Sequence, residues 1–315
     1  MTPENHAFTY LISNTGKSLA EGAPNAAFRW MHIQGDVAYA AAALSELSLD
    51  PVVVAALSAT ETRPRCTPHG DGAVVILRGV NLIEGAAPED MISLRVWIEH
   101  SRIISVGIRP LGALDDVVAS VVGDRAPVST GAMLANIALR LVDRAEPVIA
   151  ELNEELDQIE DALKDRDIAE TRSAVSDTRR MAIALRRHLF PQRDALTTLE
   201  VEGFDWIPSL ASAHLREAVD RLTRLCEELD MIRERCQVVQ DHVLDVRSEA
   251  MNQQMLVLTL VAAFFLPLSF LTGLLGINVG GVPLAQSAFG FWIICGVLLA
   301  IGVLEYVLFR IFKLF

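Results

Sequence analysis

The chain has 315 residues, 51% of them apolar, and a formal net charge of −13 at pH 7. Residues 251–315 carry only Glu305, Arg310 and Lys313 as charged side chains, so the excess of acid lies in residues 1–250. Such an acidic body argues against nucleic acid as a partner, because nucleic-acid binding needs a basic surface. The four cysteines are scattered without a CxxC spacing, which predicts reduced, structural thiols.

The N-terminal part of the chain mixes strand and helix signals. Alternating or short buried apolar runs predict four strands. They are residues 28–33, 73–78, 93–98 and 103–108, the last two forming a hairpin. Helices are expected over 44–57, on both sides of Pro51, and over 114–122, ending at Gly123. These elements predict an α/β domain within residues 1–130.

Beyond residue 131 the strand signals disappear and charged helical periodicity replaces them. Residues 131–250 are therefore expected to form a stalk of long helices. The first two helices are expected over 131–165 and 167–190, with Pro191 ending the second, because proline removes a helical hydrogen bond.

A third, much longer helix is predicted to begin at Ser209, because no proline or glycine follows until Pro267. Its length would be about 100 Å at 1.5 Å per residue. Apolar or small residues recur along it at alternating spacings of three and four, as in a coiled coil. This seam comprises Leu215, Ala218, Leu222, Leu225, Leu229, Ile232, Cys236, Val239, Val243, Val246 and Ala250. We interpret the seam as a stalk that gathers several copies of the chain around an axis.

Two uncharged apolar runs follow, Leu256–Leu275 and Ala288–Leu304. About 20 apolar residues suffice to cross a bilayer as a helix. Residues 251–315 are therefore expected to form a transmembrane hairpin, with spans of about 255–275 and 288–308 and an outer loop over 276–287. The loop carries no charge, whereas Arg310 and Lys313 flank the second span. By the positive-inside rule both termini are expected in the cytoplasm.

The first span carries a stripe of neutral, weakly polar side chains. They are Asn252, Met255, Thr259, Leu266 and Ser269. Such a stripe suits a cation that keeps its water shell, and the C-terminal end of the helix adds about half a negative charge per copy. Two spans cannot enclose a pore, so transport requires an oligomer. The spacing alone leaves open whether the Gly-x-Asn sequence at Gly276 is a helix cap or a selectivity filter.

Several motifs resemble the CorA superfamily of divalent-cation transporters. They are Met251–Met255, Phe265–Gly273 and Gly276-Ile277-Asn278, together with Phe28–His32, Leu94–Trp97 and Pro191–Leu196. In that superfamily the first span ends in Gly-Met-Asn. Here Ile277 takes the middle position, which is the variant typical of the ZntB zinc-transporter branch.

The resemblance implies an α+β membrane protein that assembles as a funnel-shaped homopentamer, with an α/β domain, long stalk helices and a central pore lined by the first span. It implies Zn²⁺ as the transported ion, with proton coupling proposed for this branch, and the bacterial inner membrane as the location. Gly276, Ile277 and Asn278 would form the selectivity segment. By position, the pore-facing residues would be Asn252, Met255, Leu258, Leu266, Ser269 and Asn278, to which the polar stripe adds Thr259.

Two alternatives to zinc transport stay open. A CorA-type magnesium or cobalt channel is the first, because the stripe offers mainly amides, hydroxyls and one thioether and does not itself select zinc. The missing acid between Gly276 and Ser287 departs from magnesium-carrying relatives. A membrane-anchored scaffold or sensor is the second alternative. We expect neither an enzyme nor a bound cofactor, since no nucleophile–base pair, phosphate loop or metal-ligand cluster appears in the sequence.

Overall fold

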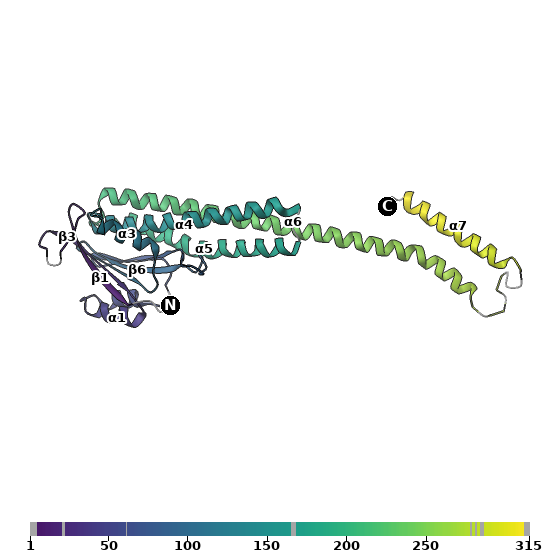
Figure 1. The fold of residues 1–315 in the computed structure, drawn as a ribbon, viewed down its shortest axis with the longest axis horizontal. Helices are drawn as coiled ribbons and strands as arrows, with labels where there is room; N and C mark the ends of the chain where they lie inside the picture. Colours follow the sequence, from purple (N-terminus) through teal and green to yellow (C-terminus); the bar gives the residue numbers. More distant parts are fainter. Residues whose placement is uncertain are drawn as a thin grey trace. The chain divides into compact units, whose positions relative to one another are not determined.

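The computed structural model describes residues 5–20, 23–60, 62–164, 168–277, 279–280, 282–283 and 287–311. The chain divides into two compact units, Met1–Gln240 and Asp241–Phe315, and Figure 1 gives the element labels. The strands are β1 (His6–Ser13), β2 (Ser18–Leu19), β3 (Ala26–Gln34), β4 (Arg65–His69), β5 (Gly72–Gly79), β6 (Ile92–Ile98) and β7 (Arg102–Gly107). The α-helices are α1 (Val37–Ser45), α2 (Pro51–Ser58), α3 (Gly112–Val122), α4 (Thr130–Asp161), α5 (Ile168–Glu202), α6 (Ser209–Leu275) and α7 (Gly290–Ile311), with a 3-10 turn at Ala162–Lys164.

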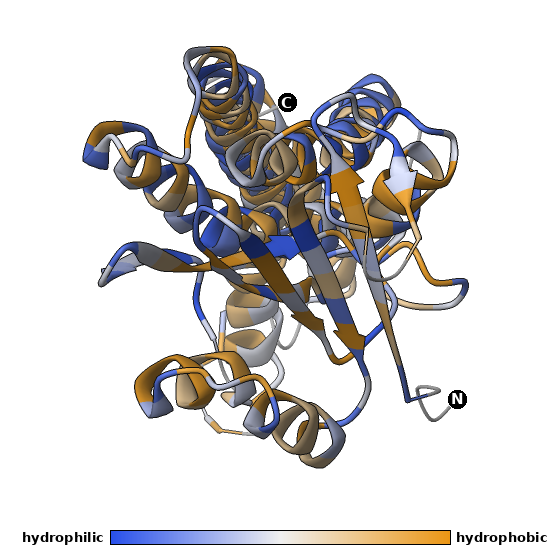
Figure 2. Ribbon diagram, turned by 90° about the vertical axis from the view of Figure 1, so that its left-hand side faces the viewer, coloured by the Kyte–Doolittle hydropathy of each residue, from blue (hydrophilic) through white to orange (hydrophobic). Residues whose placement is uncertain are grey.

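The seven strands form one sheet in the order β2-β1-β3-β7-β6-β5-β4. All neighbouring pairs are antiparallel except β3 and β7, which run parallel with Arg29 opposite Arg102. Strands β5, β6 and β7 are buried almost throughout. Near-continuous apolar runs of this kind are typical of strands covered on both faces, and Figure 2 shows helices on both sides of the sheet.

Alternate residues of β5 pack into two separate hydrophobic cores, because successive side chains of a strand point to opposite faces of the sheet. Val75 and Leu77 point into the larger core, which they share with α3, α4, α5 and the first part of α6. Val74 and Ile76 point into a smaller core closed by α1 and α2. The larger core therefore joins the sheet to the long helices in one hydrophobic body.

The apolar seam of α6 packs mainly within its own chain. From Leu215 to Val239 its residues are buried in the same core as the apolar stripes of α4 and α5. The seam was expected to gather several copies of the chain, and for this stretch that expectation is wrong. The physical reason is that a helical stripe can bury against any two helices with complementary stripes, and α4 and α5 supply them.

Pro191 does not end α5, which continues to Glu202. The predicted break is wrong, although a proline inside a helix costs roughly 3 kcal/mol or more. Leu189 before the proline and Leu196 after it are both buried in the larger core. Burial on both sides of Pro191 offsets the lost hydrogen bond and keeps the helix continuous. Pro51, by contrast, starts α2 behind the N-cap Asp50, whose side chain accepts from the Val52 N–H, so residues 46–50 interrupt the helix expected over 44–57.

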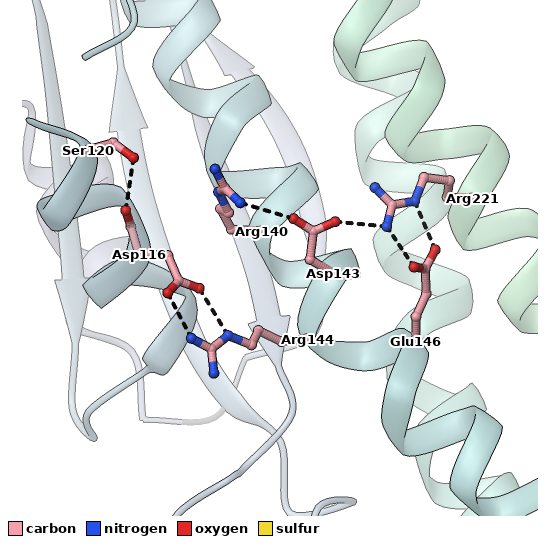
Figure 3. A network of polar contacts seen from close by, with 7 residues as sticks. All are labelled: Asp116, Ser120, Arg140, Asp143, Arg144, Glu146 and Arg221. Carbon is pink, nitrogen blue, oxygen red and sulfur yellow. Dashed lines mark hydrogen bonds and ion pairs between the residues drawn. The ribbon is translucent and has the colours of Figure 1, made fainter. Parts of the chain in front are cut away.

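Ion pairs fix α6 against α4 and α4 against α3 (Figure 3). The Arg221 guanidinium of α6 donates to Glu146 at 2.7 and 2.8 Å and to Asp143 at 2.8 Å. Arg144 of α4 makes a bidentate ion pair with Asp116 of α3: its Nε donates to Oδ2 at 2.9 Å and its Nη2 to Oδ1 at 2.7 Å. Arg144 lowers the pKa of Asp116 and Arg221 lowers that of Glu146, in each case chiefly through these bonds. Asp116 and Glu146 therefore stay charged at neutral pH, and the ion pairs that join α3, α4 and α6 persist.

The second unit holds the C-terminal part of α6 and all of α7. Both helices contain windows with a mean hydropathy of 2.3, long and apolar enough to cross a membrane, and none of either window is buried. The two helices pack on each other: Gly302 of α7 has the Phe264 ring 3.5 Å from where a Cβ would stand. The expectation of one unbroken helix from Ser209 to Leu275 is confirmed.

Candidate cation pore on helix α6

Helix α7 lies against one face of α6, and no described part of this chain covers the opposite face of α6. Half-buried residues mark the covered face: Leu260, Phe264, Leu268, Leu271 and Leu275. Val257, Leu260, Val261, Phe264 and Phe265 line a groove together with Tyr306 and Phe309 of α7. At about 100° of rotation per residue, this covered face is centred about 180° from the stripe that runs through Met255 and Leu266.

The residues expected to line the pore are all exposed. They are Asn252, Met255, Leu258, Thr259, Leu266 and Ser269. Met255 and Leu266 are 63% and 67% exposed. Thr259 donates its hydroxyl hydrogen to the Met255 carbonyl at 2.8 Å, so its oxygen keeps lone pairs for water or a hydrated cation. Nothing in the described chain covers this stripe.

The stripe extends further toward the N-terminus than the sequence interpretation placed it. Steps of three and four residues lead back from Asn252 to Ser248, Asp245 and Asp241, all exposed. The sequence carries this signal, because the same alternation continues without a break on the N-terminal side of the apolar run. Two carboxylates thus precede the weakly polar stripe on one face of α6.

Helix α6 ends at Leu275, and Gly276 closes its last turn. The Gly276 N–H donates to the Thr272 carbonyl at 2.9 Å and to the Gly273 carbonyl at 3.2 Å. Gly276 is not among the described glycines with positive φ, which are Gly16, Gly70, Gly85 and Gly203. The left-handed helix cap considered for this glycine is therefore not formed. Gly276 and Ile277 are exposed, and Asn278 lies outside the described residues.

The described cysteines and histidines do not assemble a resident metal site. Within the described ranges, no three His, Cys, Asp or Glu side chains come close enough to hold a metal ion. Cys226 and Cys236 are buried, and burial raises the pKa of each thiol to about 11. A thiol binds metal as the thiolate, so these two cysteines are packed as small apolar groups in the larger core.

Sequence comparison decides the family. The family described as "CorA-like Mg2+ transporter protein" matches residues 25–310. The chain belongs to this CorA-like family. Its known members transport ions, so the expectation that the chain is not an enzyme is confirmed, and a scaffold that only anchors in the membrane is not supported.

Two curated relatives of this CorA-like chain carry transporter names. It is 36% identical over 289 residues to the divalent cation transporter CmaX of Pseudomonas aeruginosa, covering 89% of this chain and 86% of the relative. It is 34% identical over 267 residues to the zinc transport protein ZntB of Pectobacterium carotovorum, covering 84% and 81%. The protein is therefore a divalent cation transporter of the CorA-like family.

Solved structures agree with the fold. The full-length CmaX protein matches with a TM-score of 0.80 at 32% identity, over 98% of this chain and 97% of that one. The CorA magnesium transporter of Methanocaldococcus jannaschii matches with a TM-score of 0.81 at 18% identity, over 96% and 97%, which shows the fold alone. The expected α/β domain, long helix and two C-terminal apolar helices of the CorA-like fold are confirmed.

Proposed function

We propose that this chain transports Zn²⁺ across the bacterial inner membrane as a homopentamer, through a central pore lined by the open stripe of α6. The zinc assignment is supported by the ZntB relative and by Ile277 in the Gly-Ile-Asn segment. Both termini would lie in the cytoplasm. Residues 1–130 would then form the cytosolic α/β domain, 131–250 the stalk and 251–315 the membrane hairpin.

The observation that carries the pore proposal is the two-faced character of α6. Its covered face packs on α7, whereas Asn252, Thr259 and Ser269 stand on a face that this chain leaves open. Two helices cannot surround an aqueous path, so copies of α6 placed around an axis would turn their open faces toward each other. Amide and hydroxyl groups facing that axis would bind a cation through its water shell, weakly enough for it to leave.

Asp241 and Asp245 support the same proposal from the N-terminal end of the stripe. Several copies would place these carboxylates around the cytosolic mouth, where they would raise the local concentration of cations. At the other end, the exposed carbonyl groups of the last helical turn carry partial negative charge. A cation path along this stripe would therefore meet negative potential at both ends.

Purified protein in proteoliposomes tests the proposal, with the uptake of Zn²⁺ and Mg²⁺ measured separately and with or without a pH gradient. We expect zinc flux, and faster flux when a pH gradient is imposed if protons are coupled to it. Magnesium flux without zinc flux would overturn the zinc assignment and favour a CorA-type magnesium channel. That candidate keeps support from the description of the family itself.

Asn278 is the residue of the selectivity segment whose role depends most on resemblance. We expect Asn278→Ala to abolish or deregulate flux while the oligomer stays intact, because an amide oxygen at the pore mouth would be lost. Size-exclusion chromatography with light scattering checks the oligomer. Wild-type flux and ion preference in the variant would contradict the role proposed for Gly276-Ile277-Asn278.

A further inference from the structure

A basic pocket lies in the first unit, at the edge of the sheet. Its volume is 590 Å³, within the range of small-molecule sites. Arg63 and Arg65 reach it from the start of the edge strand β4, Arg78 from the end of β5, and Arg187 and His188 from α5. The β4–β5 hairpin and helix α5, which are far apart in sequence, thus meet at one pocket.

The charge of this pocket is opposite to that of the chain. Four guanidinium groups line it, and no carboxylate of a described residue does, although the whole chain carries −13. Elsewhere the structure pairs arginines with acids, as for Arg144 and Arg221. The guanidinium groups of Arg63, Arg65 and Arg187 make no ion pair or hydrogen bond with any residue in the described part of the chain.

The floor of the pocket contains two buried nitrogen atoms that lack hydrogen-bond partners. Arg78 donates through Nη1 to the Met91 carbonyl at 3.0 Å and through Nη2 to the Thr62 carbonyl at 2.8 Å, but its Nε is buried without a partner. His188 is 8% exposed, and its Nδ1 is likewise buried and unpartnered. Buried polar groups are ordinarily hydrogen-bonded, so two such atoms in one basic pocket point to a polar ligand. Arg78 Nε can only donate, so that ligand has to accept a hydrogen bond there.

Burial and the neighbouring positive charges disfavour the charged forms of His188 and Arg78, the two side chains on the floor of the pocket. Burial, together with the charges of Arg78, Arg187 and Arg63, lowers the pKa of His188 to about 4. Burial and the neighbouring Arg187 also lower the pKa of Arg78. An anion in the pocket would relieve both effects, because it would place negative charge among like positive charges.

We propose that this pocket binds a phosphorylated small molecule with two or more negative charges, up to the size of a nucleotide. Arg63, Arg65 and Arg187 are exposed and stand at the mouth, where their planar forks can each hold two phosphate oxygens. Arg78 and His188 offer the remaining donors from the floor. An apolar ligand would leave these donors unsatisfied, and a cation would be repelled by the arginines.

Calorimetric titration of the full-length protein in detergent tests the proposal, with EDTA present to remove divalent metal. The probes are inorganic phosphate, pyrophosphate and ADP. We expect pyrophosphate or ADP to bind and binding to weaken as salt is added. Tighter binding of ADP than of pyrophosphate would assign the site to a nucleotide, and the reverse order to a simpler polyphosphate.

Matched arginine variants locate the site. Arg187→Ala and the double variant Arg63→Ala/Arg65→Ala should each weaken binding by roughly tenfold or more, because charge-assisted hydrogen bonds are lost. Arg187→Lys keeps the charge but loses the fork, and should fall between wild type and Arg187→Ala. Arg180→Ala is the control: Arg180 lies on the same helix, is 73% exposed and pairs with Asp177, so its loss should leave binding unchanged.

Three outcomes would overturn the proposal. The first is no heat of binding for any probe at millimolar concentration. The second is equal binding by wild type and by all pocket variants. The third is absent anion binding together with an oligomer that dissociates in Arg187→Ala on size-exclusion chromatography, which would make the pocket a contact between copies of the chain.

Discussion

His32 is held as a neutral imidazole inside the sheet. Its Nδ1 lies 2.8 Å from the Ser105 hydroxyl and its Nε2 lies 3.2 Å from Gln34 Oε1. The Trp30 indole N–H donates to the same hydroxyl at 3.0 Å, and this hydroxyl donates to the Met31 carbonyl at 3.4 Å. The pKa of His32 is lowered to about 4, chiefly because the ring is buried, and the bond with Gln34 opposes this effect only in part.

Stability is expected to fall between pH 6.5 and pH 4. The folded pKa of His32 lies below its unfolded value of 6.5, so the unfolded chain takes up the proton first as the pH drops. The free energy of unfolding should then decrease by about 1.4 kcal/mol per pH unit for each such histidine, and His188 adds a second. His32→Asn should remove about one histidine's share of this slope. Urea unfolding at pH 7, 6 and 5 measures it.

The exposed His242 on α6 provides the control for that experiment. His242→Asn should leave the dependence of stability on pH as it is in the wild type. A His32→Asn variant whose slope equals that of the wild type would show that His32 is not the group that titrates.

Asp245 belongs to the open stripe of α6 and lies about two helical turns before Asn252. We expect Asp245→Asn to slow cation flux by roughly threefold or more at low ionic strength, because carboxylates around a pore mouth concentrate cations. Added salt should shrink the difference, since it screens exposed charges. Glu217→Gln is the control, because Glu217 is an exposed acid of α6 on another face. Equal losses in both variants would mean that only net charge matters.

At the scale of elements, Arg221 joins α6 to α4 and is the most enclosed member of its network, with 17% of its side chain exposed. Arg221→Met keeps the apolar stem and removes the bonds to Glu146 and Asp143. We expect the free energy of unfolding to fall by about 1–2 kcal/mol. Thermal unfolding measures this loss, and 1 M salt should reduce it. Arg180→Met, which breaks an exposed pair within α5, should cost less than about 0.5 kcal/mol.

The central elements could be predicted from the sequence, whereas the edges could not. The runs around Phe28, Val75, Val96 and Ile104 became β3, β5, β6 and β7, because apolar strands buried on both faces leave a strong local signal. The outer strands β1, β2 and β4 were missed, since edge strands are short or only partly buried. Pro191 was misjudged because its cost is offset by tertiary burial, which no local pattern reveals.

The same contrast holds for the candidate sites. The open stripe of α6 is local in sequence, so a helical spacing sufficed to predict Asn252, Thr259 and Ser269 as neighbours on one face. The basic pocket joins Arg63, Arg78 and Arg187, which only the packing of α5 on the end of β5 brings together. Gln192 contributes to that contact by accepting from the Arg78 backbone N–H at 2.6 Å. Gln192 belongs to the Pro191–Leu196 motif, which is recognised in the sequence only by resemblance, so this contact was not predicted.

At the scale of the whole molecule, one chain would supply only one wall of the pore proposed above. In the first unit α6 buries its seam against α4 and α5, and in the second unit half-buried residues between Leu260 and Leu275 face α7. The chain therefore covers one face of this helix with its own elements along most of its length. Only other copies of α6 can turn the remaining face into an enclosed aqueous path.

Cysteine scanning of α6 distinguishes the two faces in the assembled protein. Ser269 lies on the open stripe, whereas its neighbour Leu268 is half-buried on the side of α7. In a background whose native cysteines are replaced by serine or alanine, Ser269→Cys should react with a charged, water-soluble thiol reagent and lose most of its zinc flux. Leu268→Cys should react slowly and keep its flux, because charged reagents do not enter an apolar helix contact. Equal reactivity at both positions would mean that α6 does not line the path, and the pore would then have to be sought on α7.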